Sequence, residues 1–136
     1  MSSSDIKDIV AIVVLLIIVF SIGILHRRPK PLNKKYFDAE WHKNQKLLAD
    51  KNSWGMVIIA ADSLLDQALK KRHYKGKTMG ERLVSAQRDL TDNDGVWFGH
   101  KLRNRIAHET GVKLKKQEVL RVLVCFRQAL KDLGAL

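Results

Sequence analysis

Cysteine is almost absent from this sequence, which has a single one, Cys125, among 136 residues. One cysteine excludes an internal disulfide framework, and it offers no pair of thiols at a metal-binding spacing. Because Cys125 lies inside an apolar helical pattern, we expect a buried and unreactive core residue, as free cysteines usually are. This use of cysteine fits a reducing compartment.

Proline and strand-like patterns are also scarce. The two prolines, Pro29 and Pro31, fall in one short stretch. No segment alternates apolar and polar residues as a half-buried strand does, and no internal repeat or low-complexity tract is present. The remaining pattern is apolar spacing of three and four residues, so we predict an all-α bundle.

Acidic residues are few relative to basic ones. The chain has 25 Lys and Arg against 14 Asp and Glu, a formal net charge of +11. Residues 36–136 hold 19 of these cations and 12 of the anions, a net charge of +7. A basic domain of this size favours polyanions, either nucleic acid or an anionic membrane surface. Charge alone does not choose between them.

Charge is missing altogether from residues 9–25, which are almost wholly Ile, Val, Leu, Ala and Phe. Seventeen residues span roughly 26 Å as a helix, close to the thickness of the hydrocarbon core of a bilayer. We therefore predict a transmembrane helix. A cleaved signal peptide is the alternative, but it requires positive charge before the apolar run and small residues at a cleavage site. In this sequence two aspartates outnumber one lysine before the run, most of the nearby cations follow it, and no Ala-x-Ala pattern ends it.

The flanking charges predict the orientation of this helix. Two aspartates and one lysine precede it, whereas a cluster of cations follows it: Arg27, Arg28, Lys30, Lys34 and Lys35. The positive-inside rule places the N-terminus outside and the following domain in the cytoplasm. We expect a single-pass protein of the cell membrane. Residues 1–8 are a short extracytoplasmic end, 9–25 span the membrane, 26–35 form a basic proline-containing linker, and 36–136 form the cytoplasmic helical domain.

Five helical segments are predicted in residues 36–136. The first runs from residue 33 or 34 to about residue 50, and the second from residue 54 to 71 after a Ser53 N-cap. Thr78 and Glu81 resemble a capping box that opens a third helix ending near residue 88. Asp92 or Asp94 caps the fourth, which ends at Thr110-Gly111. The last covers residues 115–133.

Asp62 and Asp66 lie one turn apart on the second predicted helix, on its more polar face. Paired carboxylates serve acid–base or metal chemistry at some sites. No histidine or third acid is close in sequence, so we favour a solvated face or salt bridges to the basic helices.

The densest basic run lies between the second and third helices and includes an aromatic residue. One interpretation is a loop that holds an RNA backbone while Tyr74 stacks on a base. The other is a set of cations placed favourably at a helix C-terminus, followed by a turn at Gly76. On the first interpretation, with two cations of the fourth helix added, the candidate nucleic-acid contacts are Lys71, Arg72, Tyr74, Lys75, Lys77, Lys101 and Arg105.

Residues 101–109, Lys-Leu-Arg-Asn-Arg-Ile-Ala-His-Glu, end the fourth helix and concentrate its chemistry. Arg103 offers a permanent planar fork for phosphate, and His108 is suited to moving a proton near neutral pH. On an ideal helix they lie roughly 140° apart, with His100 and Asn104 in the arc between them. We predict that this polar arc faces outward, opposite an apolar stripe, and that Asn104 orients His108.

Arg103, four intervening residues and His108, with Asn104 directly after the arginine, resemble the signature of the HEPN superfamily. The resemblance covers about residues 36–136, in helix order as well as motif. It implies a four- to five-helix up-and-down bundle that forms a homodimer and brings two motifs together. It further implies metal-independent RNA cleavage with Arg103, Asn104 and His108 as catalytic residues, no cofactor, and in some members an antitoxin or regulatory partner.

A structural interpretation of the same residues stands beside this one. A histidine in the last turn of a helix interacts favourably with the macrodipole, and an arginine on an exposed helix face is ordinary. Glu109 either pairs with a basic neighbour or orients His108. The alternative to a ribonuclease is therefore a non-catalytic module at the inner membrane surface that binds RNA, a nucleotide or a protein.

Overall fold

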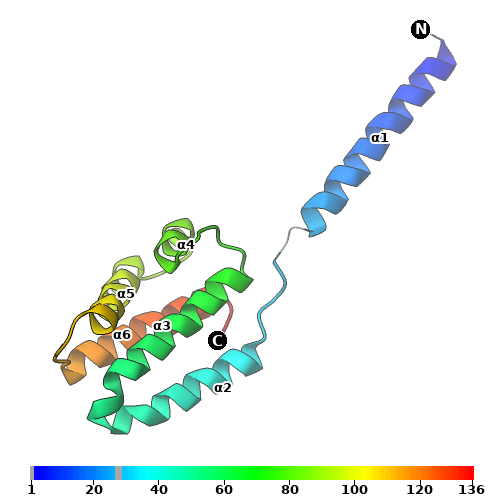
Figure 1. Ribbon diagram of the computed structural model, residues 1–136. Helices are drawn as coiled ribbons and strands as arrows, with labels where there is room; N and C mark the ends of the chain where they lie inside the picture. The colour runs from blue at the N-terminus through cyan, green and yellow to red at the C-terminus, as the bar shows by residue number, and fades with distance from the viewer. Residues whose placement is uncertain (1, 27–28) are drawn as a thin grey trace.

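The computed structural model describes residues 2–26 and 29–136, and it is helical throughout, with no strand in the described part. This confirms the prediction of an all-α fold. Figure 1 shows α1 standing apart from the bundle that the other helices form. The α-helices are α1 (Ser3–His26), α2 (Lys34–Gln45), α3 (Trp54–Lys71), α4 (Met79–Ala86), α5 (Asn93–His108) and α6 (Lys116–Asp132).

Helix α1 is the predicted apolar helix, and residues Ser3–Leu25 are long and apolar enough to cross a membrane. None of this segment is buried against the rest of the chain. The helix begins at Ser3 rather than Ile9, so it includes most of the predicted N-terminal extension. It ends at His26, and α2 begins at Lys34. Two cations of the predicted linker, Arg27 and Arg28, lie outside the described residues.

Helix α3 is the centre of the bundle, because it contacts α2, α4, α5 and α6. Its sequence supplies apolar residues at the spacing of one broad helical face, which is why it can be covered on several sides. Eight of its residues are buried, seven of them apolar and one acidic: Val57, Ile58, Ala61, Asp62, Leu64, Leu65, Ala68 and Leu69. Together with the apolar stripe of α6 they form most of the core.

Two predicted helix boundaries require correction. The first helix of the bundle ends at Gln45, and short 3-10 turns, Lys46–Ala49 and Lys51–Ser53, follow it. Ser53 does not cap α3 with its side chain, since its hydroxyl donates to Asp50 Oδ2 (3.1 Å), and Asp50 Oδ1 accepts from Asn52 N–H. Asp50 is therefore the acceptor in this turn, and the Ser53 hydroxyl acts as a donor and not as a cap of α3.

The predicted caps of α4 and α5 are confirmed. Thr78 Oγ1 accepts from Glu81 N–H at 3.2 Å, although the Glu81 carboxylate accepts from Lys77 N–H rather than from Thr78. Asp92, and not Asp94, caps α5 by accepting from Gly95 N–H at 2.9 Å. These caps fix where α4 and α5 begin, and the space between the two helices is part of the candidate site.

The end of α3 is a closed turn rather than an open loop. Tyr74 N–H donates to Leu69 O and His73 N–H to Lys70 O, and His73 has a φ of 63°. This is the left-handed residue that commonly ends a helix. The ring of Tyr74 packs against the core, and its hydroxyl donates to Asp89 Oδ2 at 2.6 Å. Burial, reinforced by Asp89, raises the pKa of Tyr74 to about 12.

Helices α5 and α6 approach closely at Gly99. A Cβ atom at this position would lie 2.7 Å from the Phe126 ring and 2.9 Å from Val122 Cγ1, so only glycine fits. Cys125 is buried nearby, as predicted, and its thiol donates to Asp92 Oδ2 at 3.2 Å. Burial and the Asp92 carboxylate raise the pKa of this thiol to about 11, which keeps it in the unreactive form.

Substitution of Gly99 tests this packing. We expect Gly99→Ala to lower the free energy of unfolding by about 1–3 kcal/mol, because the methyl group overpacks the α5–α6 contact. Gly80→Ala is the matched control, since its Cβ would have no neighbour closer than 3.6 Å. Denaturant unfolding of the full chain in detergent measures both. Equal stability of the two variants would contradict the close approach.

Candidate functional site

A polar cleft of about 450 Å³ lies beside α3, at the start of α4 and along α5. It is open to solvent, and charged or hydrogen-bonding side chains supply most of its wall. Its lining residues are Asp62, Ser63, Asp66, Thr78, Met79, Gly80, His100, Arg103 and Asn104. Three of these belong to α5, and two of the three, Arg103 and Asn104, are predicted catalytic residues.

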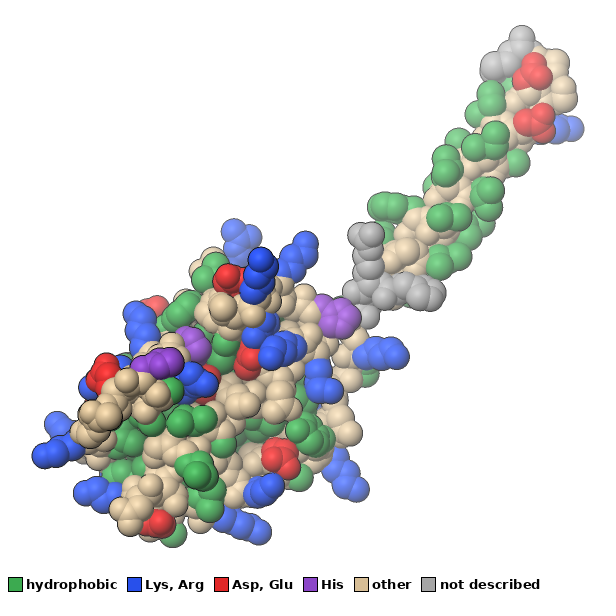
Figure 2. All heavy atoms as spheres, viewed as in Figure 1, with side chains coloured by type: hydrophobic (Ala, Val, Ile, Leu, Met, Phe, Trp, Pro, Cys, Tyr) green, Lys and Arg blue, Asp and Glu red, His purple; other side chains and the backbone are tan. Residues whose placement is uncertain are grey.

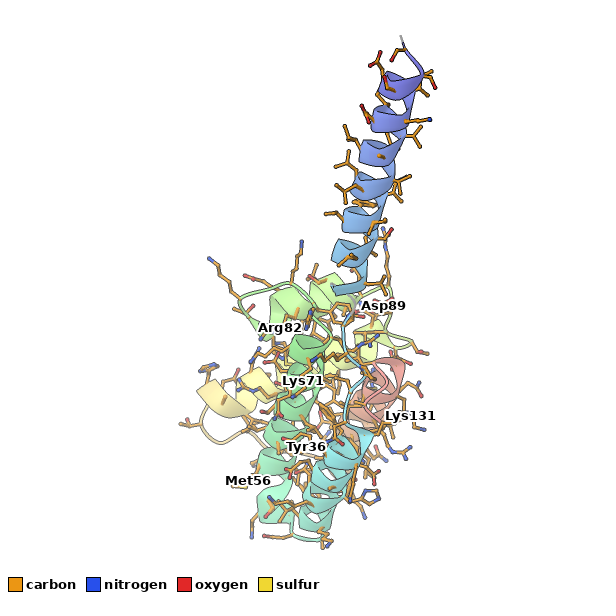
Figure 3. The ribbon with its side chains drawn as sticks, turned by 90° about the vertical axis from the view of Figure 1, so that its right-hand side faces the viewer. Tyr36, Met56, Lys71, Arg82, Asp89 and Lys131 are labelled. Carbon is orange, nitrogen blue, oxygen red and sulfur yellow. The ribbon has the colours of Figure 1, made fainter. Side chains whose placement is uncertain are left out.

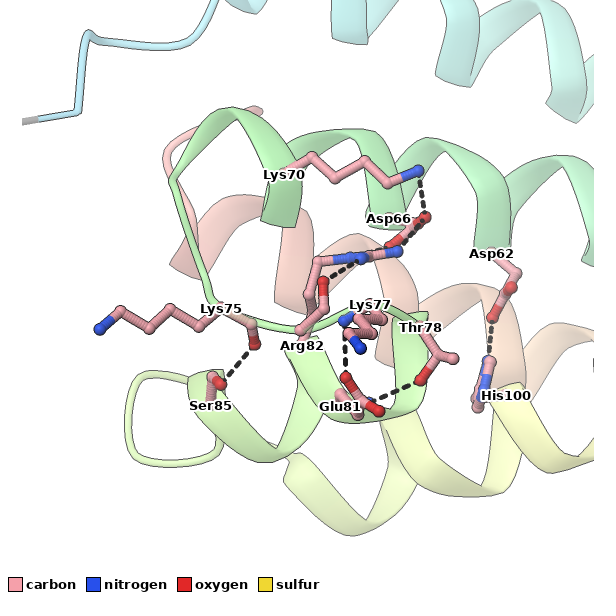
Figure 4. A network of polar contacts seen from close by, with 11 residues as sticks. Asp62, Asp66, Lys70, Lys75, Lys77, Thr78, Glu81, Arg82, Ser85 and His100 are labelled. Atoms are coloured by element: carbon pink, nitrogen blue, oxygen red, sulfur yellow. Dashed lines mark hydrogen bonds and ion pairs between the residues drawn. The ribbon is translucent and has the colours of Figure 1, made fainter.

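The deepest polar contact in this cleft joins Asp62 of α3 to His100 of α5. Asp62 Oδ1 and His100 Nδ1 are 2.9 Å apart, and both residues are buried. Figure 4 shows the two side chains pointing toward each other from their helices. A carboxylate in such a position is costly unless it is paired and hydrogen-bonded. His100 therefore satisfies one oxygen of Asp62, and its ring also meets Trp97 edge to face.

Arg103 approaches the other oxygen of the same carboxylate. Arg103 Nε lies 3.5 Å from Asp62 Oδ2, an ion-pair distance, but the buried Nε makes no hydrogen bond. Arg103 Nη1 donates to Asn104 Oδ1 at 3.1 Å. The arginine side chain remains 33% exposed, so the guanidinium is fixed on one side and accessible on the other. This is a suitable state for a group that binds an anion.

Asn104 closes the network. Its amide nitrogen lies 3.4 Å from His100 Nε2, while its amide oxygen accepts from Arg103. The four side chains therefore form a ring of contacts from Asp62 through His100, Asn104 and Arg103 back to Asp62. We call this the Asp62 ring.

The structure corrects two expectations for this helix. The arc containing His100 does not face outward throughout, because His100 is buried against Asp62. Asn104 contacts His100 and not His108, since Asp62 holds the His100 ring within reach one turn earlier. The opposite apolar stripe is as predicted, with Leu102 buried and Phe98 and Ile106 packed against the core.

His108 lies at the last position of α5 and is exposed. No hydrogen bond or ion pair holds it within residues 2–26 and 29–136. Glu109 pairs instead with Arg105, at 3.5 Å between Oε2 and Nε, which resolves the alternative left open by the sequence. Both members of this pair are more than half exposed, so the pair contributes little to stability.

The remaining predicted nucleic-acid contacts lie at the surface, except Tyr74. Lys71, Lys75, Lys77, Lys101 and Arg105 are exposed, and Arg72 is half-buried. Tyr74 is committed to the core and to Asp89, so its ring is not a free stacking platform. Figure 2 shows Lys and Arg side chains distributed over the visible face of the bundle. A distributed positive surface favours contact with phosphate over recognition of a base.

Asp66, one turn after Asp62, has a structural role. Its carboxylate accepts two hydrogen bonds from Arg82 of α4, at 2.7 and 2.9 Å, and Lys70 Nζ lies 2.9 Å away. Arg82 also donates to Gly76 O, so it ties α3, the turn and α4 together, as the contacts drawn in Figure 4 show. Figure 3 labels Arg82 among the side chains of the whole bundle. Of the two predicted alternatives, salt bridges are present at both aspartates, to Arg82 and Lys70 at Asp66 and to Arg103 at Asp62, while a solvated face is excluded for the buried Asp62.

Sequence reasoning missed Asp62 and His100 as members of the site, although one signal was available. Asp62 lies four residues after Ile58 and three before Leu65, on the apolar stripe of α3 and not opposite it. A carboxylate inside such a stripe needs a buried partner. His100, one turn before Arg103 and Asn104, is a side chain that can supply it.

No group of three or more His, Cys, Asp or Glu side chains in the described part of the chain is arranged to hold a metal ion. Comparison of the chain with protein-family models, with curated proteins and with solved structures found no match.

The pKa of Asp66 provides a test of the Arg82 contact. Burial acts to raise this pKa, but the hydrogen bonds and charges of Arg82 and Lys70 outweigh burial, so it lies below the ordinary value of 3.8. A carboxylate whose pKa is lowered on folding stabilises the fold at a pH above its ordinary pKa. This stabilisation is lost as the pH falls through the lowered pKa. Urea unfolding should therefore show that Asp66→Asn is destabilised at neutral pH and approaches wild-type stability as the pH falls below 3.8.

The exposed Asp38 provides the control for this experiment. Asp38→Asn should differ little from the wild type at any pH, because the side chain is 63% exposed and its partner is His42. A pH-independent cost for Asp66→Asn would show that the loss comes from packing and not from the ion pairs.

Proposed function

We propose that this chain is a membrane-anchored HEPN-like module whose helical bundle cleaves RNA without a metal ion, through Arg103 and His108. The observation that carries the proposal is the state of Arg103. Its guanidinium is positioned by Asp62 and Asn104 on its inner side and open to a polar cleft on its outer side. A preorganised cation of this kind stabilises the charge that develops on a phosphoryl group.

The chemistry divides between the two motif residues. Arg103 binds the non-bridging oxygens of a phosphodiester, and His108 moves a proton as the ribose 2′-hydroxyl attacks the phosphorus. Asn104 contributes by holding Arg103 rather than by orienting His108. The net positive charge of the bundle draws the RNA backbone to the surface without selecting a sequence.

A second copy is part of the proposal. Within one copy, five residues separate the two motif side chains by roughly 7–8 Å along the helix axis and roughly 140° around it. They do not converge on one phosphate from the same face. In a homodimer, two copies of α5 bring an arginine and a histidine from different chains together, as the HEPN resemblance implies.

The second candidate function is RNA binding without cleavage, and one observation favours it. A catalytic histidine is usually oriented by a further group, and within the described residues His108 has none. On this alternative, Arg103 and the surface cations hold RNA, a nucleotide or an acidic protein partner such as an antitoxin, and His108 has no chemical role.

Cleavage in the presence of a chelator decides between these candidates. The full chain, purified in detergent, should cleave single-stranded RNA in the presence of EDTA. His108→Ala should lower the rate by about 10²–10⁴-fold, because it removes a proton-transfer group. RNA binding, measured by fluorescence anisotropy, should change little in this variant.

His42→Ala is the matched control, since His42 is an exposed histidine of α2 and lies outside the cleft. It should leave the cleavage rate unchanged. Salt-sensitive RNA binding without cleavage by the wild type would reject the ribonuclease and support the binding module.

The membrane setting is part of the same proposal. The apolar length of α1 supports a single pass, and the cations after it support a cytoplasmic bundle. Residues before the span are then extracytoplasmic.

Labelling of one introduced cysteine tests this orientation. In intact cells, Ser2→Cys in a Cys125→Ala background should react with a membrane-impermeant maleimide, because Ser2 is exposed and lies before the span. Lys131→Cys in the same background should react only after lysis, as it is exposed on α6. The reverse pattern would place the bundle outside.

A further inference from the structure

We infer that His100, held by Asp62, is the general base of an RNA-cleaving site completed by His108 of a second copy. This inference rests on the proposed function and deepens it. Cleavage through the 2′-hydroxyl uses two proton transfers, one from the nucleophile and one to the leaving group. His100 provides a second imidazole close to Arg103.

The geometry of His100 is that of an oriented base. Its Nδ1 faces the Asp62 carboxylate at 2.9 Å, and its Nε2 faces Asn104 on the wall of the cleft. A carboxylate on one ring nitrogen fixes the tautomer and leaves the other nitrogen to accept a proton. Arg103 lies one helical turn away on the same side, so phosphate bound there has its ribose near His100.

The hydrogen-bond pattern of the Asp62 ring fits this role. The amide oxygen of Asn104 accepts a hydrogen bond from Arg103 Nη1, so the amide nitrogen is the atom that faces His100. His100 Nε2 therefore accepts, and Nδ1 carries the proton toward Asp62, which is the neutral form of the ring. The Asn104 contact is long, at 3.4 Å, and a substrate hydroxyl can replace it.

Cleavage at this site transfers one proton from the nucleophile and one to the leaving group. The 2′-hydroxyl gives its proton to His100 Nε2, and its oxygen forms a bond to phosphorus. The bond from phosphorus to the 5′-oxygen breaks, and that oxygen takes a proton from the imidazolium of His108. The products are a 2′,3′-cyclic phosphate and a 5′-hydroxyl. Proton exchange with water then returns both histidines to their initial states.

His108 must come from the other copy. Eight residues separate the two histidines, about 12 Å along the helix axis, which is too far for one phosphate. Antiparallel packing of two α5 helices about a two-fold axis at Asn104 places residue 100 of one copy opposite residue 108 of the other. The face of α5 that carries Lys101, Arg105 and His108 is exposed in the single chain and available for this packing.

Paired variants test the inference with the full chain. His100→Gln and His108→Ala are co-expressed with different affinity tags, and mixed dimers are isolated in detergent by purification on both tags in turn. Each variant alone should lose cleavage by about 10²-fold or more. The mixed dimer contains one site with both histidines, so it should recover about half of the wild-type rate.

Imidazole rescue separates proton transfer from folding. His100→Ala leaves space for free imidazole, which should restore part of the cleavage rate if His100 transfers a proton. His42→Ala, unaffected by imidazole, is the control. Thermal unfolding of each variant shows whether the bundle remains folded.

The outcomes distinguish this inference from the proposed function. Wild-type cleavage that persists in His100→Gln overturns the inference and leaves the ribonuclease proposal intact. Failure to obtain mixed dimers, or mixed dimers without activity, overturns the shared site. Absence of chelator-resistant cleavage by the wild type overturns both.

Discussion

The carboxylate of Asp62 is the constraint on which the organisation of the cleft depends. It is buried in the middle of α3, the helix that contacts all the other helices of the bundle. A buried carboxylate without partners is destabilising by several kcal/mol, so α5 must present groups that satisfy it. His100 and Arg103 do so from successive turns. The rotation of α5 about its own axis, and hence which residues line the cleft, follows from this requirement.

A second electrostatic contact, between Asp66 and Arg82, fixes the other wall. Arg82 binds both oxygens of Asp66 and the backbone of the turn at Gly76, which sets the position of short helix α4 against α3. The cleft thus lies between two ion-paired aspartates one turn apart. The Asp66 wall is structural, while the Asp62 wall carries the partly exposed guanidinium of Arg103 and the buried imidazole of His100.

Much of the fold follows from local sequence patterns. Apolar spacing predicted the long helices of the bundle, an uncharged apolar run predicted α1, and a capping box predicted α4. The Thr78 and Asp92 caps follow from residue type at the start of a helix. The end of α2 and the cap of α3 did not follow, because Asp50 accepts a hydrogen bond from the Ser53 hydroxyl and caps the 3-10 turn before α3. The length of α1 did not follow either, because the polar residues before the apolar run are helical although no apolar pattern indicates it.

The site was only partly predictable, for a physical reason. Arg103 and Asn104 could be found because they are neighbours on one helix in a motif of familiar spacing. Their partner Asp62 is 38 residues from His100, and no local pattern pairs the two. The basic run could be recognised in the sequence as a cluster of charges. The packing of Tyr74 on the core could not, because it depends on the turn at His73. Contacts between distant segments decide which polar side chains remain available.

The short connection between α1 and α2 bears on the proposed pairing of two copies. From His26 to Lys34 the chain can extend at most about 25–30 Å, so an inserted α1 would confine the bundle to a thin layer beside the bilayer. Copies confined in this way encounter each other by diffusion in two dimensions. The number of copies per unit of membrane area would then determine how many associate. Clustering within the membrane would therefore change the extent of association even when the number of copies in the cell stays constant.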